Sequence, residues 1–464
     1  MLKIINHYFN KNILILFFLE FCVFLVSAYL GLILRFHNRV FDFNELRSFM
    51  AHALGFAVIM LFSLCAFGMY RRQLNGEIRE TIARIGPAFL IGFTIISAIF
   101  FIIPSFQIGR GILSLTFIAS GIGVFFSRFI FLTSHHSGVF ASRVLVLGAG
   151  DLAKECGELA ESLRNTAKCM VVGYLRDGTE TISVPKSQII LPKPTLYETV
   201  IEYNVTNIYV ALQEKRGSCF STTELLDCKL RGVKIIDALD FFEREACQIR
   251  VNSLKPGWLV FGNGFEQSYY REFCKRTFDI IISIMIALIS APAMMLTAAM
   301  ILLEDKGPIF YSQERVGLAG TTFKVHKFRS MKIDAEAVGV PQWATTKDIR
   351  VTRVGGLIRK LRIDELPQIF NVLVGEMSFV GPRPERPFFV EQLNVKIPFY
   401  SVRHSIKPGI TGMAQVKYAY GASIEDALQK LQYDLYYVKN NCLFLDFLIL
   451  LDTVQVVLLG KGAR

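Results

Sequence analysis

Two kinds of hydrophobic pattern follow one another along this chain. Long apolar runs come first, at residues 13–35, 48–70, 86–104 and 111–133. Each run is close to the ~20 residues that an α-helix needs to cross about 30 Å of hydrocarbon. The pattern therefore predicts a membrane α-helical domain with four transmembrane spans over residues 1–138.

The charges around these runs bear on their arrangement. The loop between the second and third runs carries four arginines: Arg71, Arg72, Arg79 and Arg84. Such a basic loop favours the cytoplasmic side, although three arginines on the opposite side weaken this bias: Arg35, Arg39 and Arg47. Glu20 lies within the first run. We expect it to make a helix–helix contact, because a charge in hydrocarbon is costly, while a functional role stays open.

Short apolar segments replace the long runs from about residue 142. The stretch SRVLVLGAGDLAKECGELAESL predicts a buried strand, a glycine-rich turn and a helix. Further short strands are predicted at CMVVGYL, SQIIL, NIYVAL and VKIID. Strands that alternate with helices in this way indicate a parallel sheet. We therefore expect a Rossmann-like α/β domain over residues 139–240.

The glycine-rich turn of this domain matches a nucleotide-binding pattern. Gly148, Gly150 and Ala153 fit G-x-G-x-x-A between the strand and the helix. One interpretation is a nucleotide phosphate at the helix N-terminus, with Asp177, although in a turn, as a candidate for the ribose. The other is a tight turn in a scaffold that binds nothing. A lone turn of this kind supports both equally.

A fifth long apolar segment follows a linker at residues 241–270. It extends over residues 277–303 and is long enough to be a fifth transmembrane helix. Ser290 and Pro292 lie near its middle, where proline removes a backbone hydrogen bond and bends a helix. A full crossing would also put residues 304–464 on the opposite face from the α/β domain. We therefore favour a re-entrant helix whose charged ends lie at one interface.

Composition agrees with a membrane protein. Of the 464 residues, 52% are hydrophobic and 19% charged, where soluble domains are near a quarter charged. The net charge of +12 suits anionic lipids or phosphorylated substrates. No zinc-finger or RNP pattern accompanies the basic residues, which argues against nucleic acid. The nine cysteines form no C-x-x-C pair and indicate reduced thiols facing a cytosol.

Candidate chemistry lies in the polar block after this helix. RIDELPQIFNVL contains two adjacent carboxylates, Asp364 and Glu365, before Pro367 and an apolar helical run. A position near the helix N-cap would keep Asp364 ionised, which fits a plain cap, a nucleophile or a metal ligand. Adjacent carboxylates often hold Mg²⁺ beside a phosphate, so both are candidate metal ligands. Basic residues that could hold a diphosphate are Arg315, Lys327, Arg329 and Arg383, with Lys324, Lys332, Arg386, Arg403 and Lys407 nearby in sequence.

Several longer motifs in this region resemble one family. They are GPIFYSQERVG, HKFRSM, DELPQIFNVLVGEMSFVGPRP, KPGITGMAQV and YDLYYVKN, in this order. Over residues 270–464 the chain resembles the bacterial sugar transferases, monotopic enzymes that transfer a hexose-1-phosphate to a polyprenyl phosphate. With its four spans and α/β domain, it resembles the large members that initiate exopolysaccharide or O-antigen synthesis. The resemblance implies a mixed, mainly α monotopic catalytic domain at residues 271–464, which includes the re-entrant helix.

The resemblance also implies a ping-pong reaction at the cytoplasmic face of the bacterial inner membrane. Asp364 would attack the β-phosphorus of a UDP-sugar and expel UMP, and undecaprenyl phosphate would then accept the phosphosugar. Mg²⁺ on Asp364 and Glu365, with Arg383, Lys327 and Arg329, would neutralise the charge. The implied partners are the two substrates, the lipid bilayer and a second copy of the chain, without nucleic acid.

Some features leave alternatives open. Ala291 stands before Pro292 where the family often has serine, and Met413 stands where tryptophan is usual. The second departure leaves the sugar open, with UDP-glucose or UDP-galactose favoured. GAGDLA supports a nucleotide-sugar oxidoreductase or dehydratase, but Tyr436 and Lys439 are three residues apart where Tyr-x-x-x-Lys requires four. A non-catalytic, nucleotide-sensing membrane scaffold would leave the ordered motifs unexplained.

Overall fold

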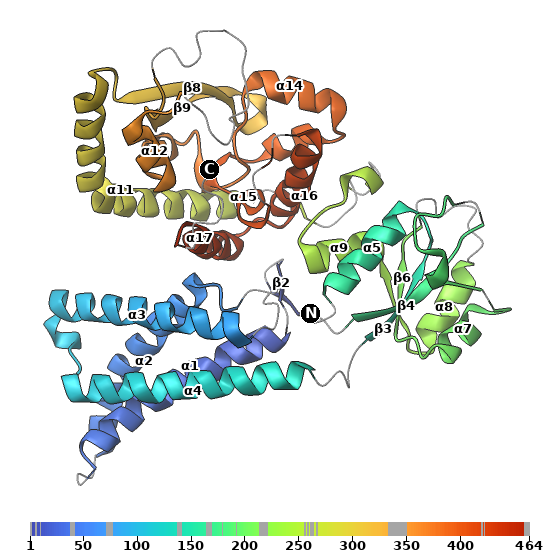
Figure 1. Cartoon of the computed structure of the whole chain (residues 1–464), viewed down its shortest axis with the longest axis horizontal. Helices are drawn as coiled ribbons and strands as arrows, with labels where there is room; N and C mark the ends of the chain where they lie inside the picture. The colour runs from blue at the N-terminus through green and yellow to red at the C-terminus, as the bar shows by residue number, and fades with distance from the viewer. Residues whose placement is uncertain are drawn as a thin grey trace. The chain divides into compact units, whose positions relative to one another are not determined.

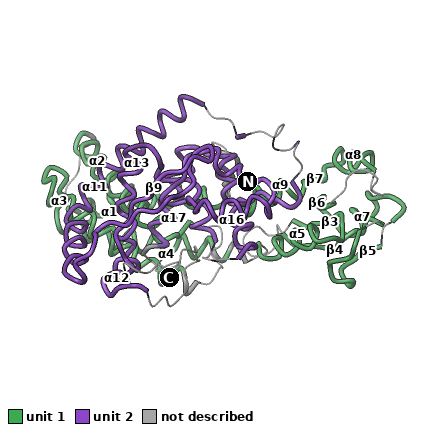
Figure 2. The backbone as a smooth tube through the Cα atoms, turned by 90° about the horizontal axis from the view of Figure 1, so that it is seen from above, with its two compact units in different colours: residues 1–4, 8–246 green, residues 5–7, 247–464 purple. Residues whose placement is uncertain are grey.

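The chain folds into two compact units in the computed structural model (Figure 2). Unit 1 comprises Met1–Ile4 and Tyr8–Ala246, and unit 2 comprises Ile5–His7 and Cys247–Arg464. The division after Ala246 falls inside the linker predicted at residues 241–270. The structure describes all residues except 1, 5–6, 10, 38–41, 71–77, 137–141, 164–168, 179, 192, 213–220, 255–256, 258, 260–263, 266–267, 333–349, 419–420, 422 and 459–464.

Four long apolar helices form the first part of unit 1, each on one of the predicted runs (Figure 1). They are α1 (Lys11–Arg35), α2 (Phe43–Ala66), α3 (Ile78–Ile102) and α4 (Arg110–His136). Each is long and apolar enough to cross a membrane. Many of their large apolar side chains are exposed, as expected for helices in contact with lipid. These helices make the chain a membrane-associated protein. Arg71 and Arg72 of the basic loop lie outside the described residues.

The predicted contact of Glu20 is confirmed. Glu20 is fully buried on α1, and its Oε1 accepts a hydrogen bond from Arg128 Nε on α4 at 2.6 Å. Arg128 also donates to Glu20 Oε2 at 2.9 Å and to the Met69 carbonyl at 2.6 Å. The Tyr70 hydroxyl donates to the same carboxylate. A buried ion pair with this many hydrogen bonds connects α1 to α4 within apolar surroundings.

The second part of unit 1 is the expected parallel α/β domain. Its five strands lie in the order β5–β4–β3–β6–β7, and each neighbouring pair is parallel. The strands are β3 (Ser142–Leu147), β4 (Cys169–Leu175), β5 (Ile189–Ile190), β6 (Asn207–Val210) and β7 (Lys234–Asp237). The helices are α5 (Asp151–Ser162), α7 (Leu196–Glu202), α8 (Thr222–Leu230) and α9 (Ala238–Ala246). Val144 and Val146 of β3 belong to one buried cluster and Leu145 and Leu147 to another, so both faces of the sheet are covered.

Unit 2 combines a long bent helix with short helices and two small sheets (Figure 1). The strands β8 (Phe310–Val316) and β9 (Thr322–Phe328) pair antiparallel, and β10 (Ser378–Val380) and β11 (Gly409–Thr411) pair parallel. The helices are α11 (Tyr269–Asp305), α12 (Arg353–Lys360), α13 (Gln368–Val374), α14 (Pro387–Lys396), α15 (Met413–Lys417), α16 (Ile424–Asn440) and α17 (Leu443–Leu458). Two 3-10 segments, η5 (Ile363–Glu365) and η6 (Tyr400–Ser405), lie between them.

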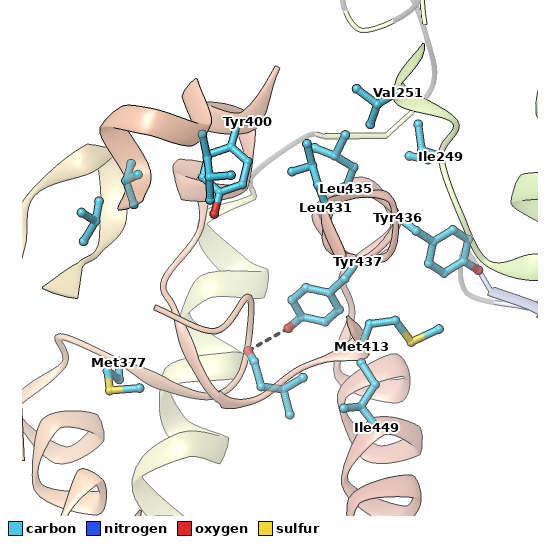
Figure 3. Packing of buried hydrophobic residues seen from close by; sticks show 14 of the residues in the cluster. Ile249, Val251, Met377, Tyr400, Met413, Leu431, Leu435, Tyr436, Tyr437 and Ile449 are labelled. Atoms are coloured by element: carbon cyan, nitrogen blue, oxygen red, sulfur yellow. Dashed lines mark hydrogen bonds between the residues drawn. The ribbon is translucent and has the colours of Figure 1, made fainter. Parts of the chain in front are cut away.

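Helix α16 packs in the core of unit 2 (Figure 3). Leu431 and Leu435 are completely buried, and Ile249 from the predicted linker belongs to the same cluster. The Tyr437 hydroxyl donates to the Val380 carbonyl at 2.9 Å, which connects α16 to β10 (Figure 3). The core therefore fixes the strand that precedes the Gly-Pro-Arg-Pro segment.

Both ends of α11 contact unit 2. Near its start, Arg276 donates to two carbonyls at the C-terminal end of α13, at 2.5 and 2.6 Å. At its end, Asp305 forms an ion pair with Arg329, which follows β9. Pro292 lies inside the helix, and Figure 1 shows two arms that run in different directions. The helix is therefore bent and attached to the same unit at both ends.

Candidate active site

The two adjacent carboxylates lie in a 3-10 turn. The turn is η5, and Arg362 before it adopts the left-handed backbone conformation with a φ of 59°. Helix α13 begins only at Gln368, with Pro367 at its N-cap, and neither segment has a side-chain cap. The predicted cap role of Asp364 is therefore wrong. The tight turn carries the chain past Asp364 and Glu365 before the helix begins.

Three basic side chains surround Glu365. Its Oε1 accepts from Lys327 Nζ and from Arg383 Nη2, both at 2.9 Å. Arg362 Nη1 lies 3.9 Å from Oε2. Burial opposes a charge at this position, but the three cations outweigh it and hold the pKa of Glu365 well below its usual range. Glu365 is thus an ionised group that joins β9 to the segment after β10.

Asp364 is in a different state, although it is also buried, with 8% of its surface exposed. Its Oδ1 is inaccessible and accepts no hydrogen bond from any residue that the structure describes. Burial and then the charge of Glu365 raise the pKa of Asp364, against the opposing effects of Lys327, Arg359 and Arg362. A buried oxygen in this state is costly, which is typical of a functional position.

Helix α13 is fixed against β9 by a single amide side chain. Asn371 is buried, and its Oδ1 accepts from the His326 amide at 3.1 Å. Its Nδ2 donates to the Lys324 carbonyl at 2.7 Å. Both contacts are with β9, the strand that carries Lys327. Arg276 binds the carbonyls of the next two residues, Val372 and Leu373, so these contacts together fix α13 directly after η5.

The Gly-Pro-Arg-Pro segment after β10 is held through its carbonyl groups. Its prolines have no amide hydrogen, so the segment has few donors of its own. Four consecutive carbonyls accept hydrogen bonds instead: Pro382 from the Gly409 amide at 3.0 Å, Arg383 from Arg403 at 2.9 Å, Pro384 from Arg315 at 3.1 Å and Glu385 from the Val316 amide at 2.9 Å. The backbone at Arg383 is therefore fixed, and its side chain reaches Glu365.

The structure brings some of the predicted phosphate-binding residues together and not others. Lys327 and Arg383 meet at the carboxylate pair. Arg315 lies on β8 and donates to the Gly-Pro-Arg-Pro segment. Arg329 is buried and forms its ion pair with Asp305, at the end of α11. The first two are the better placed for a phosphate at the pair.

The predicted break in the membrane helix lies within α11. Pro292 is inside the helix, where it removes one backbone hydrogen bond. The Ser290 hydroxyl donates to Met294 Sδ at 3.5 Å. The Ser290 side chain is thus engaged one turn further along the same helix.

The glycine-rich turn of the α/β domain is in contact with a carboxylate of the same chain. Gly148 has a φ of 117°, and Gly150 is the N-cap of α5. Between them, the Ala149 amide donates to Glu180 Oε2 at 2.9 Å. Glu180 therefore lies where such a turn presents amides to a phosphate. Nucleotide binding at this turn, with Asp177 or without it, stays a prediction.

The donor set at the carboxylate pair suits a magnesium ion. Among the described residues, no three His, Cys, Asp or Glu side chains gather in one place. Mg²⁺ often takes only one or two protein carboxylates and completes its shell with phosphates and water. Asp364 and Glu365 supply two adjacent carboxylates, which fits that pattern, and Oδ1 of Asp364 is buried. Two cavities along the β8–β9 hairpin, of about 270 and 490 Å³, are lined by neither carboxylate.

Sequence reasoning missed the residues that hold this site in position. Asn371 fixes α13, Arg276 and Asp305 fix α11, and Asp434 pairs with Arg403 below the Gly-Pro-Arg-Pro segment. Each is a polar residue within or beside an apolar pattern. Such a residue is costly to bury without a partner, so its position was a usable signal.

The apolar helices make this a membrane-associated protein, and comparison with known proteins identifies its family. The family model described as bacterial sugar transferase matches residues 270–460. A UDP-glucose:undecaprenyl-phosphate glucose-1-phosphate transferase from Xanthomonas campestris is 31% identical over 434 residues, which cover 89% of this chain and 88% of the relative. The chain belongs to the bacterial sugar transferase family.

Two other relatives match a smaller share of the chain. A UDP-N-acetylgalactosamine-undecaprenyl-phosphate N-acetylgalactosaminephosphotransferase from Aeromonas hydrophila is 49% identical over 240 residues, or 52% of this chain and 56% of the relative. A UDP-glucose:undecaprenyl-phosphate glucose-1-phosphate transferase from Klebsiella pneumoniae is 41% identical over 191 residues, or 41% of each chain. The matched part spans about half the length of these two relatives.

Proposed function

We propose that this chain transfers a sugar-1-phosphate from a UDP-sugar to undecaprenyl phosphate and so initiates exopolysaccharide or O-antigen synthesis. The observation that carries the proposal is the state of Asp364. It is a buried carboxylate with an oxygen that no described donor reaches, next to a carboxylate with strong cationic partners. Relatives from three bacteria bear names of undecaprenyl-phosphate sugar phosphotransferases, which supports the same reaction.

In the first half-reaction, a carboxylate oxygen of Asp364 attacks the β-phosphorus of the UDP-sugar. The bond between that phosphorus and the bridging oxygen breaks, and UMP leaves with the electron pair. Lys327 and Arg383 hold Glu365 and so keep positive charge beside the reacting phosphate. The Arg383 side chain is about a third exposed, at 36%, and a guanidinium is a strong partner for a phosphate oxygen.

In the second half-reaction, a phosphate oxygen of undecaprenyl phosphate attacks the phosphorus held on Asp364. The carboxylate leaves, and undecaprenyl-diphospho-sugar is formed. Each step exchanges one phosphate anhydride for another, so no external energy source is needed. The acceptor brings its own proton-free oxygen, so neither step requires a general base among these residues.

Asp364 and Glu365 would hold Mg²⁺ together with phosphate oxygens of the donor. The ion would supply positive charge that reduces the repulsion between a carboxylate and a diphosphate. That charge would also lower the pKa of Asp364, which burial raises in the protein alone.

We further propose that α11 is re-entrant and that α1 to α4 span the bacterial inner membrane, with unit 2 on the cytoplasmic face. The contacts of both ends of α11 with unit 2 support this arrangement. The helix has 37 residues and would measure about 55 Å if straight, more than a single crossing needs. The bend at Pro292 allows it to enter and leave one face of the bilayer. A homodimer is part of the proposal.

The sugar of the donor is the least defined part of the reaction. The relative from Aeromonas hydrophila, at 49% identity, is named for N-acetylgalactosamine, and the other two are named for glucose. We therefore propose UDP-N-acetylgalactosamine as the first donor to test, before UDP-glucose and UDP-galactose.

The proposed reaction is tested with the full chain in detergent, with undecaprenyl phosphate, Mg²⁺ and each UDP-sugar. We expect UMP release with one of the donors and formation of a lipid-linked diphospho-sugar. Release of UDP, or NAD(P)-dependent oxidation of the sugar without UMP, would favour the oxidoreductase or dehydratase instead. A labelling site placed after Lys306 tests the membrane arrangement, since reaction with a periplasmic reagent would rule out the re-entrant helix.

A further inference from the structure

The side chain of Arg403 lies behind the segment that carries Arg383. Arg403 is 5% exposed and lies on η6. Its Nη2 donates to the Arg383 carbonyl at 2.9 Å, and its Nη1 donates to the Tyr400 hydroxyl at 2.6 Å. It therefore reaches the backbone of the residue whose side chain donates to Glu365, but makes no hydrogen bond itself to either carboxylate of the site among the described residues.

Asp434 on α16 is the counter-ion of Arg403. It is 2% exposed, and its Oδ2 lies 2.8 Å from Arg403 Nη2. Two other charged groups face it, Glu385 from the Gly-Pro-Arg-Pro side and Lys430 from its own helix. Burial raises the pKa of Asp434 to about 6, although Arg403 opposes the shift. The same nitrogen of Arg403 thus contacts a core carboxylate and the backbone of the active-site segment.

We propose that the buried Asp434–Arg403 pair is a positioning device, which holds the Arg383 backbone so that the Arg383 guanidinium stays on Glu365. This inference rests on the proposed function for its catalytic readout. Asp434 and Arg403 are positioning residues, since neither touches the reacting atoms.

The backbone chemistry of the segment explains why such a device is needed. Pro382 and Pro384 on either side of Arg383 supply no amide donors. The Arg383 carbonyl therefore depends on a donor from outside, and a guanidinium is the donor that reaches it. The ion pair with Asp434 and the hydrogen bond to the Tyr400 hydroxyl both restrict the orientation of this guanidinium.

A small displacement of the Arg383 side chain is expected to slow catalysis. A displacement of about 1 Å in a catalytic group can cost on the order of 100-fold in rate. We therefore expect Asp434→Asn to lower kcat for UMP release by roughly 10-fold to 100-fold. Arg403→Lys keeps the charge but loses the planar guanidinium, and it should lower kcat by a similar factor.

A double-mutant cycle tests the route of this effect. Asp434→Asn is combined with Arg383→Gln in the full chain, and kcat and the thermal unfolding temperature are measured for all four proteins. If Asp434 acts through Arg383, Asp434→Asn lowers kcat in the wild-type background but has little further effect once Arg383 is replaced. Multiplicative losses in kcat would overturn the proposal. Glu425→Gln removes an exposed carboxylate from the same helix and serves as the control, with unchanged kcat expected.

A measurement without substrate separates this inference from the proposed function. Hydrogen–deuterium exchange of the peptide that covers residues 381–386 is compared between wild type, Asp434→Asn and Glu425→Gln. We expect faster exchange in Asp434→Asn only. Unchanged exchange would overturn the positioning role whatever the activity. Faster exchange in a chain that releases no UMP with any donor would retain the positioning role and reject the proposed reaction.

Discussion

Two buried carboxylates in this chain have opposite surroundings. Glu20 lies among the membrane helices, fully buried, with hydrogen bonds from Arg128 and Tyr70 on its two oxygens. Asp364 lies in unit 2, 8% exposed, with one oxygen that receives no hydrogen bond from the described residues. The first is compensated within the fold. Oδ1 of the second has no such compensation among the described residues.

This difference in hydrogen bonding distinguishes the two carboxylates, although both are buried. Both side chains would be costly to bury alone. At Glu20 the cost is offset by a cation in the same bundle, which also connects two helices. At Asp364 the adjacent cations Lys327 and Arg383 are engaged by Glu365, and the buried Oδ1 receives no hydrogen bond from the described residues. The predictions below test that distinction.

The largest expected effect is the loss of transfer on replacing Asp364. Asp364→Asn should lower UMP release by at least about 1,000-fold, because it removes the attacking oxygen. Its thermal unfolding temperature should not fall, since no hydrogen bond to Oδ1 is lost. UMP release at the wild-type rate would exclude Asp364 as the nucleophile.

Glu20→Gln should have the opposite effect, with stability lowered and activity retained. It leaves Arg128 buried without its counter-ion, which costs about 3–5 kcal/mol in comparable cases. Thermal unfolding in detergent should show the loss, with the activity of the folded fraction retained. Replacing both Glu20 and Arg128 by leucine should restore most of the stability. A single variant as stable as wild type would show that the pair contributes little.

Asp434 lies between these two cases, because it is buried with a cation but its pKa is raised to about 6. A raised pKa in the folded state means that stability is highest at low pH and is lost as pH rises through about 6. Relative to wild type, Asp434→Asn should therefore gain roughly 3 kcal/mol of unfolding free energy from pH 4 to pH 7. Thermal unfolding of both proteins across this range provides the measurement. A constant difference would mean that Asp434 is ionised throughout.

The dependence of UMP release on the Mg²⁺ concentration tests the role of Glu365. If Glu365 holds Mg²⁺, Glu365→Gln should raise the half-saturating Mg²⁺ concentration for UMP release by about 10-fold to 100-fold. If it acts through Lys327 and Arg383, kcat should fall while that concentration stays the same. Titration of Mg²⁺ on both proteins distinguishes the two roles.

The smallest effect concerns packing beside the site, where α12 offers a matched pair of glycines. A Cβ on Gly355 would lie 2.0 Å from the Ser330 carbonyl oxygen, whereas a Cβ on Gly356 would meet nothing within 4 Å. Gly355→Ala should destabilise unit 2 by about 1–3 kcal/mol. Gly356→Ala should be neutral or stabilise it by up to about 1 kcal/mol. Equal effects on thermal unfolding would contradict the close approach of α12 to Ser330.

Much of the architecture was predictable because it depends on periodicity. The four apolar runs became α1 to α4, and the short strands became a parallel sheet. A helix–helix contact of Glu20 was predicted, but its partner was not, because Arg128 is 108 residues away in the sequence. Periodicity reports which face of an element is buried, but not what lies against it.

The residues of the site were predictable from the sequence, but their geometry was not. Asp364 and Glu365 are adjacent in the sequence, yet one turn of 3-10 helix gives them different partners. The left-handed Arg362 that starts this turn has no sequence signal, since such conformations favour glycine. The contacts of Arg315, Arg329 and Asp434 depend on how distant segments pack, which no local pattern encodes.

The attachment of both ends of α11 to unit 2 has a consequence for the lipid. A helix that crosses a bilayer must match its thickness, and mismatch costs fractions of a kcal/mol per Å. Helices α1 to α4 would be subject to this requirement if they span the membrane as proposed. A bent helix with both ends on one unit would instead enter only one leaflet of the bilayer. The distance of Asp364 from that membrane surface would then be the same in thin and thick membranes. Changing the acyl-chain length should then affect the stability of the four helices more than the encounter with the lipid phosphate.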